Sequence, residues 1–214
     1  MPRNCCQMED NTFGEAEAKA NLKDYRRRGP ANQTKLILEA VRSIGLKDAA
    51  LLDVGGGIGA IHHELLGDVA REAMHVDASS AYLKVATEEA KRQGHGERVK
   101  FIHADFTDVA ADLPKVDVVT LDRVVCCYPD FRSLLKAAAA RSRIALAMTY
   151  PRETWYLRMG GTVINFFQGL RKDPFRMFLH PVVEMDALLK REGFERTALR
   201  RLFVWEMALY QRVN

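Results

Sequence analysis

The sequence predicts an α/β protein built on a parallel sheet with helices on both faces. Two features predict this class: short apolar runs alternate with stretches of helical periodicity, and a glycine-rich turn directly follows the first run. The chain has 214 residues, of which 48% are hydrophobic and 28% charged, as in ordinary soluble globular proteins. We expect one domain over residues 1–214, because this length suits a single substantial core.

Apolar runs of strand length recur through the middle of the chain. We expect five core strands, at residues 51–54, 73–76, 99–102, 116–121 and 143–149. Helical spacing of apolar residues predicts helices at residues 32–44, 61–66, 80–93 and 131–140. Strands that alternate with helices of this length favour a parallel sheet.

The two ends of the chain differ from this middle part. Residues 1–31 are polar and charged, and we expect an N-terminal arm that ends at Gly29-Pro30. Residues 151–182 mix aromatic, apolar and basic side chains, and we interpret them as a lid or insertion with a short helix at 161–169. A last helix and two strand-like runs, expected to pair as an antiparallel hairpin, occupy residues 183–191, 195–203 and 205–212.

The strongest signal for a binding site is the turn after the first strand, Leu51-Leu-Asp-Val-Gly-Gly-Gly-Ile-Gly-Ala60. Glycines at such a turn allow the backbone to approach a ligand closely, and the following helix presents free N–H groups. The run also fits a dinucleotide fingerprint, because Gly55-x-Gly57-x-x-Ala60 is followed by an acid, Asp77. Asp53 favours a cationic ligand instead, since its charge beside the turn would repel a pyrophosphate.

The spacing Asp53-x-Gly55-x-Gly57-x-Gly59, with Asp77 after the second strand and Asp105 after the third, resembles the class I S-adenosylmethionine-dependent methyltransferases. This resemblance covers about residues 51–149. It implies a doubly wound, Rossmann-like sheet of seven mostly parallel strands with a C-terminal antiparallel hairpin. It also implies a cofactor-binding core at residues 32–150, a substrate-side insertion at 151–182 and a last helix and hairpin at 183–214.

The resemblance assigns S-adenosyl-L-methionine as the cofactor and gives roles to individual residues. Asp53 would help to place the cofactor's amino group, through water or backbone, and Asp77 would accept both ribose hydroxyls. Asp105 would accept from the adenine amine, with Phe106 covering the ring. Asp122, after the fourth strand, would border the sulfonium and the substrate. The cofactor-binding set is Asp53, Gly55, Gly56, Gly57, Gly59, Asp77, Asp105, Phe106 and Asp122.

The segment from Asp122 to Asp130 lacks the Asn-Pro-Pro-Tyr-type signature for flipped bases or protein amides, and it loosely resembles the small-molecule branch that includes the magnesium-protoporphyrin O-methyltransferases. We therefore expect a small-molecule acceptor, methylated at oxygen. A general base is needed only for an acceptor that arrives protonated. The candidate bases are His180, Tyr128 and Asp122, and the candidate substrate residues are Tyr25, Arg28, Cys126, Tyr128 and Arg158.

Several of these residues also have purely structural interpretations. An acid after a strand is often a helix cap, His180 could serve packing, and Cys126 with Cys127 could be small buried side chains or line a pocket. For the adjacent pair His62 and His63 we favour surface or packing roles over ligation, and we expect no metal site.

Composition and charge exclude other classes. The net charge of +4 is too small to indicate a nucleic-acid partner, and no apolar stretch is long enough to span a membrane. The vicinal pairs Cys5-Cys6 and Cys126-Cys127 do not suggest a disulfide framework, so we expect a cytoplasmic protein. The alternatives left open are an NAD-type oxidoreductase, a non-catalytic protein that binds the cofactor, and a nucleic-acid methyltransferase.

Overall fold

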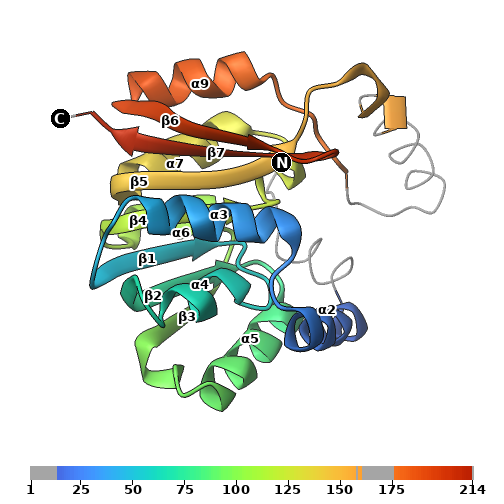
Figure 1. Ribbon diagram of the computed structural model, residues 1–214, viewed down its shortest axis with the longest axis vertical. Helices are drawn as coiled ribbons and strands as arrows, with labels where there is room; N and C mark the ends of the chain where they lie inside the picture. The colour runs from blue at the N-terminus through green and yellow to red at the C-terminus, as the bar shows by residue number, and fades with distance from the viewer. Residues whose placement is uncertain (1–13, 158, 161–175, 214) are drawn as a thin grey trace.

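The computed structural model describes residues 14–157, 159–160 and 176–213. One seven-stranded sheet has the order β3-β2-β1-β4-β5-β7-β6 (Figure 1). The strands are β1 (Ala49–Val54), β2 (Ala70–Asp77), β3 (Val99–His103), β4 (Val116–Asp122), β5 (Ser142–Pro151), β6 (Phe194–Arg201) and β7 (Trp205–Arg212). The helices are α2 (Glu15–Arg28), α3 (Asn32–Ser43), α4 (Ala60–Leu65), α5 (Ser80–Arg92), α6 (Phe106–Val109), α7 (Phe131–Arg141) and α9 (Val182–Arg191).

Strand pairing follows the predicted pattern. Strands β3, β2, β1, β4 and β5 pair in parallel, whereas β7 is antiparallel to both β5 and β6. The predicted seven-stranded, mostly parallel sheet and its C-terminal antiparallel hairpin are therefore confirmed. The carboxyl ends of β1 to β4 meet at one edge of the sheet, where ligands of open α/β sheets usually bind.

The sequence explains which strands are central. In β1 and β4 nearly every residue is buried, because helices cover both faces of these strands. Strand β6 instead carries exposed charged residues, among them Arg200 and Arg201, and it forms an edge of the sheet. Charged residues on an edge strand discourage pairing with a further strand.

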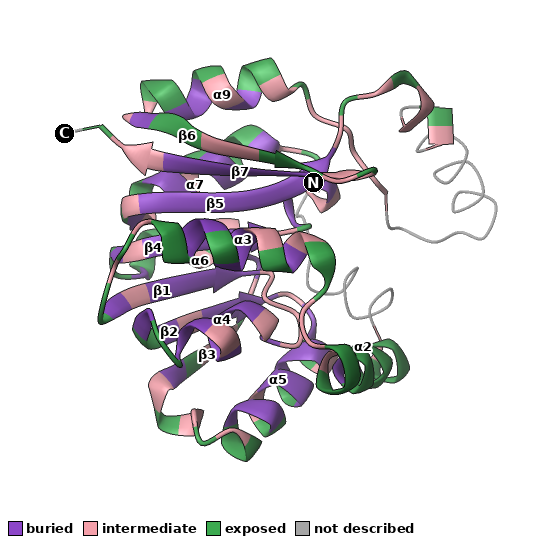
Figure 2. Cartoon of the chain, viewed as in Figure 1, coloured by how far each residue is buried: buried purple, intermediate pink, exposed green. Residues whose placement is uncertain are grey.

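The helices form two layers around the sheet, and Figure 2 shows the buried strands between them. Helices α3 and α4 pack on one face, where Ile37, Val41 and Leu65 are fully buried. Helices α6, α7 and α9 belong to the core on the other face, which contains Leu134 and Leu188.

Helix α2 lies in the predicted N-terminal arm and was not indicated by the sequence pattern. Only two of its side chains, Ala18 and Leu22, are buried, and they pack with Tyr82 and Val85 of α5. The rest of the helix is polar, so its apolar positions are too few to stand out in the sequence.

Part of the predicted insertion at 151–182, including the expected helix at 161–169 and the candidate residue Arg158, lies outside the described residues. Within the residues that are described, no helix combines the length and apolar character needed to cross a membrane.

Candidate active site

Three of the predicted acids gather at the carboxyl edge of the sheet. Asp77 is the last residue of β2, Asp122 is the last residue of β4, and Asp105 follows the end of β3. The glycine-rich loop, residues 55–59, connects β1 to α4 at the same edge. The topology therefore brings together residues that are far apart in the sequence.

Asp77 joins the glycine-rich loop to the end of β2. Its Oδ2 accepts a hydrogen bond from the backbone N–H of Gly57 at 2.8 Å, and its Oδ1 accepts from the N–H of Ser79 at 2.8 Å. The side chain is largely buried, with 9% of the residue exposed. These bonds fix the carboxylate in one orientation beside the loop.

Gly59 shows why the loop needs glycine. It has φ +83°, and a Cβ at this position would lie only 2.3 Å from Cε1 of His62. Both the backbone conformation and the contact with the imidazole exclude a larger residue without rearrangement.

Asp53 lies beneath the loop and is completely buried. Its Oδ1 accepts a hydrogen bond from Oγ1 of Thr120 at 2.8 Å, while Oδ2 lies 3.4 Å from Nδ1 of His62. Burial raises the pKa of Asp53 to about 6, against the opposing effects of His75 and Thr120. Because the carboxylate does not reach solvent, it can influence a ligand only through the loop.

Asp105 caps helix α6 and also lies at the candidate site. Its Oδ1 accepts from the N–H of Thr107 at 2.9 Å and so caps α6, and the hydroxyl of Tyr128 donates to the same oxygen. Phe106 is only 2% exposed and packs in the core, and its predicted role in covering the adenine ring stays a prediction.

Asp122 is held by two threonines. Thr34 Oγ1 donates to its Oδ2 at 2.6 Å, and Thr149 Oγ1 donates to its Oδ1. The next residue, Arg123, has φ +62°, and its N–H donates to Thr149 Oγ1 at 2.9 Å. The Arg123 side chain remains 51% exposed, with Nε 3.8 Å from Asp122 Oδ2.

His180 also makes internal contacts. Its Nε2 lies 2.8 Å from the carbonyl oxygen of Tyr128 and 3.1 Å from that of Val125, which requires that Nε2 carry the proton and donate. The ring packs against Phe131 and Phe178, at centroid distances of 4.6 and 5.9 Å. Burial lowers the pKa of His180, although the two carbonyls oppose this shift. These contacts fix the loop after β4.

The three candidate bases, His180, Tyr128 and Asp122, thus all have hydrogen-bond partners within the protein. Cys126 is buried, with Sγ 3.4 Å from the carbonyl oxygen of Arg123. This position agrees with the interpretation of Cys126 as a small buried side chain.

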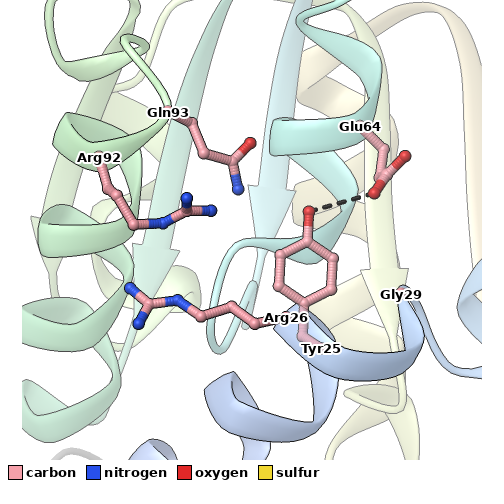
Figure 3. Close-up of a pocket in the computed structure, with 6 residues that line it drawn as sticks. All are labelled: Tyr25, Arg26, Gly29, Glu64, Arg92 and Gln93. Atoms are coloured by element: carbon pink, nitrogen blue, oxygen red, sulfur yellow. Dashed lines mark hydrogen bonds between the residues drawn. The ribbon is translucent and has the colours of Figure 1, made fainter.

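Tyr25 lines a pocket of about 570 Å³ between helices α2, α4 and α5. Figure 3 shows its hydroxyl pointing toward Glu64 of α4, to which it donates at 3.1 Å. The pocket is lined by Tyr25, Arg26, Gly29, Glu64, Arg92 and Gln93. None of these is a loop glycine or one of the acids at the sheet edge. Arg28 is an exposed side chain 3.9 Å from Asp24.

His62 and His63 are both buried, at 0% and 3% exposure, so neither is a surface residue. Burial lowers the pKa of His62 well below its usual value and that of His63 to about 3.

The sequence reasoning missed His75, Thr34 and Arg123, which complete the surroundings of Asp53 and Asp122. An arginine directly after the fourth strand was visible in the sequence, but its positive φ was not.

Comparison with known proteins identifies the class. Residues 51–143 match the profile of a methyltransferase domain family. The fold and this domain are those of class I S-adenosylmethionine-dependent methyltransferases, which confirms the resemblance noted in the sequence. The match favours this class over the NAD-type oxidoreductase.

Individual relatives agree with this class. A curated relative, 3-amino-4-hydroxybenzoate 4-O-methyltransferase from Streptomyces cremeus, is 34% identical over 102 residues, which cover 44% of this chain and 26% of the relative. The matched part thus spans about a quarter of that enzyme.

Two solved structures resemble nearly the whole chain in fold. Magnesium protoporphyrin IX methyltransferase from Synechocystis PCC 6803, with bound S-adenosylhomocysteine (SAH), has a TM-score of 0.69 at 19% identity, covering 91% of this chain and 95% of its own. An O-methyltransferase family protein from Burkholderia thailandensis has a TM-score of 0.73 at 16% identity, covering 97% of this chain and 62% of its own. S-adenosylmethionine (SAM) is the cofactor of this class, and a second structure of the Synechocystis enzyme contains it.

Proposed function

We propose that this protein transfers the methyl group of SAM to an oxygen atom of a small, anionic acceptor. The observation that carries the proposal is the link between the glycine-rich loop and Asp77, which lies at the same sheet edge as Asp105 and Asp122. This arrangement supplies a backbone surface and carboxylates for a cofactor with a positive charge, an ammonium group and ribose hydroxyls.

Bound SAM supplies an activated methyl group on a sulfonium. The residues of this chain then need to orient the acceptor oxygen in line with that methyl group and exclude water, and proximity of this kind contributes several orders of magnitude in rate. Asp77 and the glycine-rich loop would bind SAM. Asp122 is kept rigid by Thr34 and Thr149.

The state of the candidate bases supports an acceptor that is already ionised. His180 donates Nε2–H to backbone carbonyls, Tyr128 donates to Asp105, and Asp122 accepts from two threonines. A carboxylate oxygen needs no base, whereas a neutral phenol or amine does. A carboxylate acceptor therefore fits the described part of the site better than a neutral one.

Arg123 is the residue we assign to acceptor binding. It follows the last residue of β4, its backbone is held in the left-handed region, and half of its side chain is exposed. A left-handed conformation in a residue other than glycine costs about 1 kcal/mol or more and tends to occur at functional sites. A guanidinium at this position suits the carboxylate of an acceptor.

Calorimetric titration with SAH tests the cofactor half of the proposal. We expect one binding site per chain and at least about tenfold weaker binding in Asp77→Asn, because the loop and the ribose lose a charged acceptor. Asp108→Asn, a charge change at an exposed residue, is the matched control and should bind normally. Absence of SAH binding, or equal affinity in Asp77→Asn, would contradict this half.

Turnover measurements on acceptors of similar size test the second part of the proposal, which is the preference for an anionic acceptor. We expect carboxylates to be methylated in preference to neutral phenols and amines of similar size. Arg123→Gln should raise KM for the acceptor about 10- to 100-fold while SAH affinity is unchanged. Arg143→Gln is the control, because Arg143 is also 3.8 Å from an aspartate but lies at the start of β5, at the opposite edge. Equal use of neutral acceptors would reject the anionic assignment.

A further inference from the structure

Beneath the glycine-rich loop lies a cluster of three buried side chains with no role in the mechanism above. Asp53 comes from β1, His62 from α4 and His75 from β2, and all three have 0% exposure. Each offers one potential ligand atom, and these atoms lie within 4.8 Å of one another. None of the three is one of the acids at the sheet edge, although His75 lies next to Asp77.

Two of the three distances within the cluster match those around a tetrahedral metal ion, and the third pair of atoms, on Asp53 and His75, lies within 4.8 Å. Nδ1 of His62 is 3.3 Å from Nδ1 of His75 and 3.4 Å from Oδ2 of Asp53. Zinc binds nitrogen and oxygen at about 2.0–2.2 Å, so two ligand atoms of a tetrahedral site lie roughly 3.3–3.5 Å apart. The two separations, 3.3 Å between the imidazoles and 3.4 Å between His62 and Asp53, both fall within this range.

Hydrogen bonding alone accounts poorly for these contacts. A proton on Nδ1 of His62 would have to be shared between the two other atoms, at distances longer than ordinary hydrogen bonds. Without that proton, its lone pair would face the carboxylate of Asp53. A cation at the centre would accept lone pairs from all three residues at once.

Several polar atoms of the cluster, one of them a ligand atom, lack hydrogen-bond partners. Oδ2 of Asp53, Nε2 of His62 and Nε2 of His75 have no hydrogen-bond partner among the described residues. A carboxylate oxygen buried in this way is costly unless a positive charge compensates it. Zinc and similar transition-metal ions take ligands of this kind, two imidazoles and one carboxylate.

The surroundings complete the features expected of a metal site. Nε2 of His75 lies 3.8 Å from Oδ2 of Asp77, which is too far for a hydrogen bond but close enough for the carboxylate to act on the imidazole electrostatically. Gly56 covers the cluster, and a Cβ there would lie 2.7 Å from Oδ2 of Asp53 and 2.8 Å from Nδ1 of His75. A larger residue at this position would therefore collide with two of the ligand atoms.

We propose that Asp53, His62 and His75 bind a divalent transition-metal ion of the zinc type, which braces the glycine-rich loop from below. Because the three residues are closed to solvent, the ion is structural and takes no part in methyl transfer. These residues supply three of the four ligands of a tetrahedral ion, so the fourth would be a water molecule enclosed in the protein. Through His75 and Asp77 it connects to Gly57 of the loop. Sequence spacing does not suggest this site, since the ligands come from three elements.

The test measures metal in the tag-free full chain after expression in zinc-supplemented medium and extensive dialysis. We expect about one zinc ion per chain in the native protein and less than about 0.2 in His75→Gln and Asp53→Asn, since removal of one of three ligands weakens binding strongly. His63→Gln is the matched control: this buried neighbour, whose ring centroid is 4.3 Å from that of His62, is not a ligand and should keep the ion.

A second measurement keeps the proposal testable if the ligand variants fail to fold. The native chain refolded with Co²⁺ should show the intense visible bands of tetrahedral cobalt, and Zn²⁺ should raise its melting temperature relative to chelator-treated protein. Native protein without metal, ligand variants that retain it, or a cobalt spectrum without tetrahedral bands would each overturn the proposal. SAH binding is measured in parallel and tests only the proposed function.

Discussion

At the scale of single residues, the glycine-rich loop is shaped by what lies beneath it as much as by what it binds. Gly56 and Gly59 are the two loop positions where a Cβ would collide with buried imidazoles, at 2.8 and 2.3 Å. The sequence predicted glycines for close approach of a ligand, and the structure adds close approach of His75 and His62 from the opposite side. The loop therefore needs glycine both for close approach of a ligand and for close packing against His75 and His62.

Gly59→Ala tests this second requirement. We expect a loss of about 2–4 kcal/mol in the free energy of unfolding, because the new methyl group adds a clash with His62 to an unfavourable positive φ. Gly94→Ala is the matched control, with φ +76° but nothing within 4 Å, and should lose only about 1 kcal/mol. Urea unfolding measures both variants, and equal losses would show that the imidazole contact is unimportant.

At the scale of elements, helix α2 is attached to α5 by charge as well as by two apolar side chains. Glu89 of α5 has a fully buried side chain and accepts from Arg26 of α2 at 2.6 Å and from Arg92 at 2.6 Å. Although burial alone would raise the pKa of Glu89, bonds to Arg92, Gln93 and Arg26 lower it to about 2. Folding therefore favours the ionised form of this carboxyl.

This lowered pKa predicts how stability depends on pH. The contribution of Glu89 is present above its unfolded pKa of 4.5 and is lost as pH falls toward about 2, up to about 3.5 kcal/mol at 1.4 kcal/mol per pKa unit. Glu89→Gln should be less stable at pH 7, with a smaller difference near pH 3. The exposed neighbour Glu88→Gln serves as the control in urea unfolding followed by circular dichroism. A deficit in Glu89→Gln that is the same at both pH values would contradict this account.

At the scale of the whole molecule, the fold was more predictable than the site. The apolar runs located every strand because central parallel strands are buried on both faces, as in β4, and the predicted ends differ from the observed ones by at most three residues. Helix α2 escaped prediction because its buried contacts are few. The contacts of His75, Thr34 and Arg123 could not be predicted either, since they depend on which strands are neighbours in the sheet and on a single positive φ.

The arrangement of one loop and one set of acids at one sheet edge predicts a single cofactor site that depends on the folded chain. Binding to the native state alone should raise the free energy of unfolding by about 2.7 kcal/mol at an SAH concentration 100 times Kd and by about 4.1 kcal/mol at 1,000 times Kd. Urea unfolding at several SAH concentrations measures this dependence, whose slope against the logarithm of concentration is RT for one site. Asp77→Asn should shift the onset to higher SAH concentration, whereas Arg123→Gln should leave the curve unchanged because Arg123 is assigned to the acceptor. A slope of zero would mean that SAH does not bind the native chain, and a slope near 2RT would require a second site that this edge does not provide.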